Sequence, residues 1–386
     1  MDPFYRVREY FFRNFHGNPL FVKAPGRINL AGEHLDYNKG FVLPAAIDRY
    51  IYFAVAHNSE RNLVRIYSVD YSEYFETDTS GLLPVRNHWS NYLSGVIQLL
   101  QLYTGRTFTG FDVVFGGDLP QGAGLSSSAA VECGLARALC KLFEIEIDKM
   151  ELAQLCMRAE HEYAGVHCGL LDQFACLFGK KDHVISMNCK TLQYRYIPFQ
   201  NDAYSVLLFN TNKPHSLAEN DEFNMRVASC HKGVAALQKN NFEIECLCDA
   251  SVSELHAVKE QMDIDSYDRC LYIIEESVRY KKAVTALEKN DMKYFAGLLY
   301  QTQHGLKELY KISCPELDIL IDFAKSRKEI YGAKLMGGGY GGCTINIVDK
   351  TAAANLADEA IALYNSNTPY RLSVYNVEMV DGAAVL

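Results

Sequence analysis

The chain has 386 residues, of which 49% are hydrophobic and 22% charged, the balance of a globular protein with two or three domains at roughly 100–200 residues each. Its net charge of −9 argues against nucleic acid as a major partner, because binding a phosphate backbone needs a basic surface. No apolar run of about 18 residues is long enough to span a membrane, and the first residues lack the apolar stretch of a signal peptide. We therefore expect a cytoplasmic protein without a membrane partner. The sequence identifies no protein partner.

Twelve cysteines are present, and they follow no disulfide framework. Several lie within apolar helical patterns: Cys133, Cys140, Cys156 and Cys176. We predict that these are buried thiols in a reducing compartment.

The first half of the chain mixes strand and helix patterns. Apolar strand patterns lie at 21–24 (before a Pro-Gly-Arg turn), 41–44, 51–56, 63–67 and 111–115. Helical periodicity is found at 89–104, 127–143, 149–164 and 170–178. These strands are not regularly separated by helices, so a doubly wound sheet is not expected.

The second half begins with further strand patterns at 183–187 and 206–210. Residues 217–330 are mostly helical, and the chain then alternates a strand at 343–348, a helix at 351–364 and a strand at 372–377. We predict two α+β domains with a boundary between about 190 and 220.

A glycine- and serine-rich segment runs from Asp118 to Ala130. Its glycines allow a ligand to approach the backbone, and three serines then open an Ala-rich helix whose N-terminus suits a phosphate. It is neither a Walker A loop nor a Gly-x-Gly-x-x-Gly motif. A serine-capped glycine turn is the alternative, and the run of small and hydroxyl-bearing residues favours a phosphate loop.

A second segment, residues 23–40, places Arg27, Glu33, His34 and Asp36 in a loop between two apolar strands. Carboxylates suit the recognition of polyols, because each accepts several hydroxyl hydrogen bonds. A solvated loop with an Arg–Glu ion pair is the alternative.

Two further segments carry unusual residues. Five glycines occur in the six residues 337–342, more than a tight turn requires, and indicate a backbone that passes close to a neighbour. Glu160 lies near the end of an amphipathic helix, and Asp172 opens an apolar segment. Burial would raise the pKa of Asp172, whereas a nearby arginine would lower it.

Taken together, these segments resemble the motifs of the GHMP small-molecule kinases, and residues 26–38 resemble the galactokinase signature within that superfamily. The resemblance continues through 168–174, 210–217 and 313–317 and covers essentially the whole chain. It implies a bilobal α+β fold, with an N-terminal domain like domain 2 of ribosomal protein S5 (1–200) and a ferredoxin-like C-terminal domain (201–386). It also implies ATP-dependent phosphorylation of the C1 hydroxyl of D-galactose, the entry to the Leloir pathway.

The resemblance assigns roles to individual residues. Asp172 would be the catalytic base and Arg27 its charge partner. The substrate-binding positions would be Glu33, His34, Leu35, Asp36, Gly169 and Phe223. The ATP-binding positions would be Ser68, Gly122, Ala123, Gly124, Leu125, Ser126, Ser127 and Ser128. Ser128 and Glu160 would hold Mg²⁺, which prefers a few hard oxygen ligands.

This sequence departs from the family pattern at three positions. Leu35 stands where the family usually has Thr, Ala31 where it has Ile, and Phe223 where most members have a sugar-contacting Tyr. Two alternatives stay open: a related kinase acting on N-acetylgalactosamine or another sugar, and a sensor that binds galactose and ATP without transfer. The intact segment 126–130 favours an enzyme, since such sensors lose residues of the phosphate loop.

Overall fold

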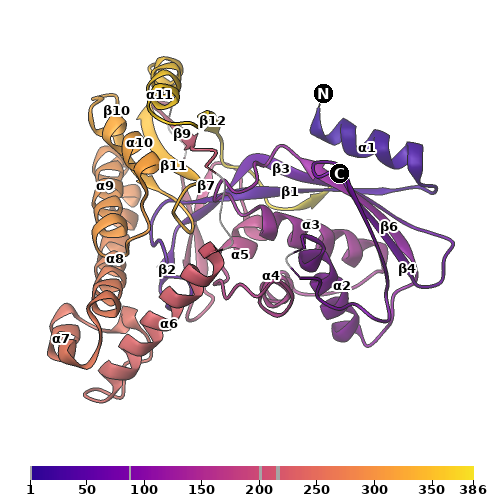
Figure 1. Ribbon diagram of the computed structural model, residues 1–386, viewed down its shortest axis with the longest axis horizontal. Coiled ribbons are helices and arrows are strands. Elements are labelled where there is room, and N and C mark those ends of the chain that lie inside the picture. The colour runs from indigo at the N-terminus through magenta and orange to yellow at the C-terminus, as the bar shows by residue number, and fades with distance from the viewer. Residues whose placement is uncertain (1, 87, 200–201, 214–217) are drawn as a thin grey trace.

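The computed structural model describes residues 2–86, 88–199, 202–213 and 218–386. The described residues form three β-sheets with helices packed on them, as Figure 1 shows. The α+β class is therefore confirmed. Among the described residues, no helix combines the length and the hydropathy needed to cross a bilayer.

The larger sheet has six strands in the order β13-β1-β3-β6-β4-β5, and only β4 and β6 run parallel. The strands are β1 (Leu20–Asn29), β3 (Pro44–His57), β4 (Leu63–Ser68), β5 (Glu73–Asp78), β6 (Phe111–Gly117) and β13 (Ala384–Val385). One face carries α1 (Pro3–Asn14), and the other carries α2 (Ser90–Thr104), α3 (Ser127–Leu142), α4 (Lys149–Ala159) and α5 (Leu171–Phe178) (Figure 1). The phosphate-loop helix α3 thus packs directly on β1 and β3.

The predicted Pro-Gly-Arg turn after residue 24 is wrong. β1 continues through Pro25, Gly26 and Arg27 in antiparallel pairing with β3, and a bulge between Pro25 and Arg27 absorbs the irregularity. Gly26 is required there because a Cβ atom would lie 2.3 Å from a methyl of Leu119 and 3.0 Å from the carbonyl oxygen of Leu125. The bulge therefore sets Arg27 against the glycine- and serine-rich loop.

A four-stranded sheet has the order β10-β11-β9-β12. Its strands are β9 (Tyr204–Asn210), β10 (Ile330–Leu335), β11 (Cys343–Asp349) and β12 (Ser373–Val377). The helices that follow β9 along the chain are α6 (Ala218–Gln238), α7 (Val252–Ala257), α8 (Ile264–Glu288), α9 (Met292–Glu308), α10 (Pro315–Lys325) and α11 (Ala353–Asn367). A small third sheet joins β2 (Phe41–Val42), β7 (His183–Asn188) and β8 (Tyr194–Pro198).

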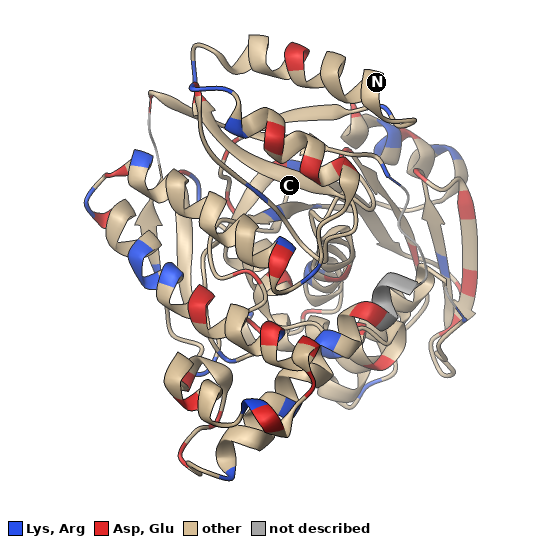
Figure 2. Cartoon of the chain, turned by 60° about the vertical axis from the view of Figure 1, so that its left-hand side comes forward, with Lys and Arg blue, Asp and Glu red and all other residues tan. Residues whose placement is uncertain are grey.

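Most predicted elements are present, but α1, β5, β8 and β10 were not predicted. The helix expected over 149–164 ends as an α-helix at Ala159 and continues as one wider π-type turn, Glu160–Ala164. The division into two domains at residue 200 stays a prediction. The C-terminal strand β13 pairs with β1, near the other end of the chain. Basic and acidic residues are interspersed along the helices that face the viewer in Figure 2.

The cysteines agree with the sequence-based expectation. All twelve are free thiols, and Cys133, Cys140, Cys156 and Cys176 are buried.

Candidate active site

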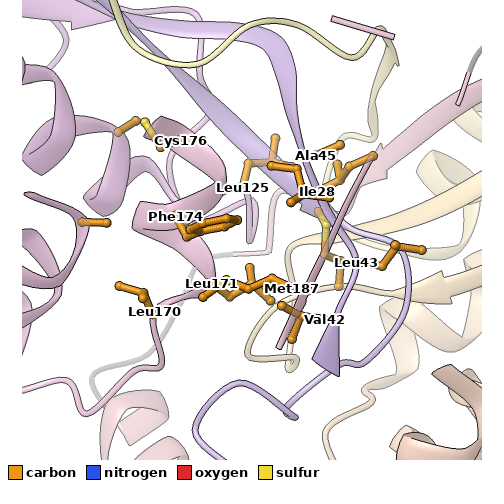
Figure 3. Close-up of a cluster of buried hydrophobic side chains, with 14 of the residues drawn as sticks. Ile28, Val42, Leu43, Ala45, Leu125, Leu170, Leu171, Phe174, Cys176 and Met187 are labelled. Carbon is orange, nitrogen blue, oxygen red and sulfur yellow. The ribbon is translucent and has the colours of Figure 1, made fainter. Parts of the chain in front are cut away.

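A hydrophobic cluster fixes the segments that carry the predicted catalytic residues. Ile28 of β1, Leu125 of the glycine-rich loop and Leu171 of α5 belong to one buried core, and Figure 3 shows them beside Phe174. In the sequence, each of these three residues is adjacent to a polar residue of the predicted site. Close packing of the apolar side chains therefore fixes where those polar neighbours stand.

The polar neighbours are Arg27, Ser126 and Asp172, and they contact one another. Arg27 Nε donates to Asp172 Oδ1 at 2.6 Å, and Ser126 Oγ donates to Asp172 Oδ2 at 2.5 Å. Arg27 Nη1 also donates to the carbonyl oxygen of Gly124 at 2.5 Å. Each oxygen of the Asp172 carboxylate is thus oriented by a donor, and the same arginine holds the glycine-rich loop.

The glycine-rich loop ends at the N-terminus of α3, which begins at Ser127. Ser126 has a left-handed backbone with φ 58°, and Gly124 has φ 72°. A Cβ atom at Gly124 would lie 2.9 Å from the carbonyl oxygen of Met336, and one at Gly342 would lie 3.1 Å from the backbone of Ala123. The glycine-rich C-terminal segment therefore passes close to the predicted phosphate loop, as its composition indicated.

The predicted magnesium ligands also lie together. Glu160 is buried and accepts a hydrogen bond from Gln173 Nε2 at 2.7 Å and one from Cys168 Sγ at 3.4 Å. Burial raises the pKa of Glu160 to about 7, the negative charge of Asp172 adds to this, and hydrogen bonds from Cys168 and the Ser128 side chain oppose it.

A carboxylate and a hydroxyl in contact are hard oxygen ligands that fit Mg²⁺. Among the described residues, no group of three or more His, Cys, Asp or Glu side chains could hold a metal ion.

Of the predicted sugar residues, Asp36 and Gly169 face each other. A Cβ atom at Gly169 would lie 2.2 Å from Asp36 Oδ2, so only glycine leaves room for this carboxylate. Burial raises the pKa of Asp36 to about 7, and the negative charge of Asp172 adds to the effect. Both residues line a cavity of about 740 Å³.

His34 is buried with φ 65°, and its Nδ1 is 2.9 Å from the hydroxyl of Tyr37. Its Nε2 has no hydrogen-bond partner of ordinary geometry among the described residues. Burial lowers the pKa of His34 to about 4, and the cationic Arg226 contributes in the same direction. The imidazole is therefore neutral at neutral pH.

The remaining candidates are placed differently. Phe223 is half-buried on α6, and its ring lies 5.4 Å from that of Tyr37 and 6.2 Å from that of His34. The Leu35 side chain is fully buried in the core, and its place among the substrate contacts stays a prediction. Ser68 is also fully buried, its hydroxyl accepts from the backbone N–H of Tyr71 at 3.3 Å, and it does not line the nearby cavity.

That nearby cavity, of about 170 Å³, was missed by the sequence reasoning. It adjoins the phosphate loop at Gly122 and Ser128 and is lined on the other side by aromatic rings, among them Tyr71, Trp89 and Tyr92. An apolar stripe at helical spacing is typical of a core face, so the periodicity at 89–104 predicts a helix and gives no sign of a cavity. The flat apolar walls beside a phosphate loop suit a nucleotide base.

Three family models match the chain. They are described as "GHMP kinases N terminal domain" (91–180), "Galactokinase galactose-binding signature" (9–57) and "GHMP kinases C terminal" (283–366). A crystal structure of mevalonate kinase shares the fold, with a TM-score of 0.66 at 19% identity over 94% of this chain and 99% of that one. The fold and the site thus define a GHMP kinase.

Relatives with higher sequence identity narrow the assignment from the GHMP kinases to one family. The galactokinase of Thermotoga maritima is 35% identical over 94% of this chain and 98% of its own. That of Bos taurus is 35% identical over 99% and 96%. The crystal structure of Lactococcus lactis galactokinase complexed with galactose superposes with a TM-score of 0.93 at 30% identity, covering 98% of each chain. The chain belongs to the galactokinase family.

Proposed function

We propose that this protein transfers the γ-phosphoryl group of ATP to the C1 hydroxyl of D-galactose, giving galactose 1-phosphate and ADP. The observation that carries the proposal is the Asp172 carboxylate, held by Arg27 and Ser126 at the end of the phosphate loop. The negative charge of Asp172 helps to raise the pKa of Asp36, so the proposed sugar-side and phosphate-side groups are close enough to share one site.

In this proposal Asp172 accepts the proton of the C1 hydroxyl as the oxygen attacks the γ-phosphorus. Arg27 keeps a positive charge beside the carboxylate and near the transferring group, where negative charge is spread over the phosphoryl oxygens. The reaction needs positioning more than strong activation of the nucleophile, because the transition state is loose. The short contacts of Arg27 to Asp172 and to Gly124 supply that positioning.

The nucleotide would lie with its base in the aromatic cavity and its phosphates at the N-terminus of α3. The left-handed turn at Ser126 and the helix N-terminus at Ser127 present backbone N–H groups to anionic oxygens. Ser128 and Glu160 would hold Mg²⁺, which neutralises phosphate charge when bound. We infer that the enzyme works in the cytoplasm, since twelve free thiols fit a reducing compartment.

Sugar recognition is assigned to Asp36, His34 and the main chain at Gly169. Asp36 is the buried hydrogen-bonding carboxyl that the axial C4 hydroxyl of galactose would satisfy and the equatorial hydroxyl of glucose would not. Leaving a buried polar group unpaired costs about 1–3 kcal/mol, or roughly one to two decades in kcat/KM.

The test is a coupled assay of ADP formation with a panel of free sugars. We expect galactose to give the highest kcat/KM. A higher value for N-acetylgalactosamine or another sugar would overturn the assigned substrate. Galactose and ATP binding without ADP formation would indicate a sensor instead of an enzyme.

A further inference from the structure

Lys334 is a fully buried cation that the proposed reaction does not use. It lies on β10 with an exposed fraction of 0%, and its Nζ donates to Glu33 Oε2. Nζ also donates a longer hydrogen bond, of 3.4 Å, to the carbonyl oxygen of Leu335. The ion pair joins residues 301 positions apart and ties the four-stranded sheet to the galactokinase signature.

The acceptor positions of Glu33 are nearly all taken by the protein. Oε2 receives Lys334 and, at 3.3 Å, Asn29 Nδ2, while Oε1 receives the backbone N–H of Gly337 at 3.0 Å. The main-chain carbonyl of Glu33 accepts from the hydroxyl of Tyr272 at 3.2 Å. A carboxylate oxygen can accept two hydrogen bonds, so Oε1 has one further acceptor position, which the proposed function assigns to a sugar hydroxyl.

Gly337 connects the Glu33 carboxylate to the glycine-rich loop, the predicted phosphate loop. A Cβ atom at Gly337 would lie 3.2 Å from the Cα of Gly124, so the two backbones are in close contact. The carbonyl of Gly124 accepts from Arg27, which holds Asp172. A shift of Glu33 would therefore be passed through Gly337 and Gly124 to the groups that carry out the transfer.

Stability does not account for this ion pair. Desolvating two charges costs several kcal/mol each, and a well-packed apolar pair of similar volume is often as stable or more so. The pair instead fixes the orientation of the Glu33 carboxylate. With Lys334 on Oε2, Oε1 points toward Gly337 and the proposed sugar position.

We propose that Lys334 is a positioning residue for the phosphoryl transfer, fixing Glu33 and, through Gly337, the alignment of the sugar site with the phosphate loop. The proposal rests on the proposed function, because it concerns the same site. The proposal requires that the KM for galactose and the KM for ATP both change when Lys334 is replaced, although Lys334 contacts neither substrate.

The test compares Lys334→Met with Lys334→Arg, and uses Lys281→Met on the exposed face of α8 as a matched control. We expect Lys334→Met to raise KM for galactose and for ATP several-fold each and to lower kcat, with Lys334→Arg restoring most of the loss. Lys281→Met should leave all three unchanged. A purely structural role would lower the melting temperature of Lys334→Met at unchanged KM and kcat, and this result would overturn the proposal.

A double variant covers the case in which Lys334→Met fails to fold, because Glu33→Gln combined with Lys334→Met leaves no unpaired buried charge. If Lys334 acts through Glu33, the double variant should match Glu33→Gln alone within about twofold in both KM values. A clear further loss in the double variant relative to Glu33→Gln alone would overturn the proposal.

Failure of the proposed function is distinguishable from failure of this proposal. If the wild-type protein forms no ADP with galactose, calorimetric titration with galactose and with ATP applies the same comparison to binding. Unchanged affinities in Lys334→Met would then refute the role of Lys334.

Discussion

Replacing Asp36 by Asn should stabilise the fold while removing the proposed sugar recognition. Asp36 is held in a site that disfavours its charge, because it is buried and faces the negative charge of Asp172. Its pKa is raised from 3.8 to about 7. The folded state therefore binds a proton that the unfolded state has already lost over that interval, and the free energy of unfolding falls as the pH rises from about 4 to about 7.

The magnitude follows from the size of the shift. Each pKa unit corresponds to about 1.4 kcal/mol, so raising the pH from about 5 to 7 costs the wild-type protein about 3 kcal/mol at this residue, with little further change above 7. With an unfolding entropy of about 2.1 cal/mol/K per residue, 3 kcal/mol corresponds to about 4 °C for a chain of 386 residues. Asn cannot ionise, so Asp36→Asn avoids this loss.

The assay is thermal unfolding of the wild-type protein and Asp36→Asn at about pH 5, 6, 7 and 8. The melting temperature of the variant relative to wild type should rise by about 4 °C between pH 5 and pH 8, with the change complete near pH 7. Asp358→Asn, at an exposed position of α11, is the control, and its difference from wild type should be small at every pH. A pH-independent difference for Asp36→Asn would refute the account of a strained, charge-bearing Asp36.

Further variants test the proposed roles one at a time. Asp172→Asn should lower kcat by about 100-fold or more and leave ATP binding intact, and near wild-type turnover would remove Asp172 as the base. Ser128→Ala and Glu160→Gln should each raise the Mg²⁺ concentration needed for half-maximal rate several-fold; two unchanged titrations would exclude both from the metal site. Phe223→Tyr should lower the galactose KM by up to about tenfold with kcat nearly constant, since one neutral hydrogen bond contributes about 0.5–1.5 kcal/mol. Lower thermal stability at unchanged KM would show that Phe223 only packs against Tyr37 and His34.

Much of the site could be predicted because its residues lie in segments of unusual composition. The resemblance put Arg27 beside Asp172 and Ser128 beside Glu160, and the structure brings both pairs into contact. The expectation of a turn at Pro25 was wrong because a Pro-Gly pair ordinarily ends a strand. Here pairing with β3 resumes on the far side of a bulge, which only the tertiary structure supplies.

Other features leave no local signal. A single lysine in an apolar strand is usually a solvent-facing residue, so Lys334 could not be recognised without Glu33, whose place beside it depends on the whole fold. Tyr71 and Trp89 line the aromatic cavity, but aromatic residues are also typical of a core, so the sequence did not indicate a cavity there. By contrast, α1 could have been predicted, because Asp2 caps it by accepting from the backbone N–H of Phe4 at 2.8 Å and Pro3 occupies its first position.

The central claim is that the chain phosphorylates galactose at C1 with Asp172 as the base. Phosphorus NMR of a reaction with galactose, ATP and Mg²⁺, run in parallel with Asp172→Asn, tests it most directly. The account predicts galactose 1-phosphate and ADP in equal amounts from the wild-type protein and about 100-fold less of each, or lower, from the variant over the same reaction time. A sugar phosphate esterified at another carbon, ADP without sugar phosphate, or full product formation by Asp172→Asn would contradict it.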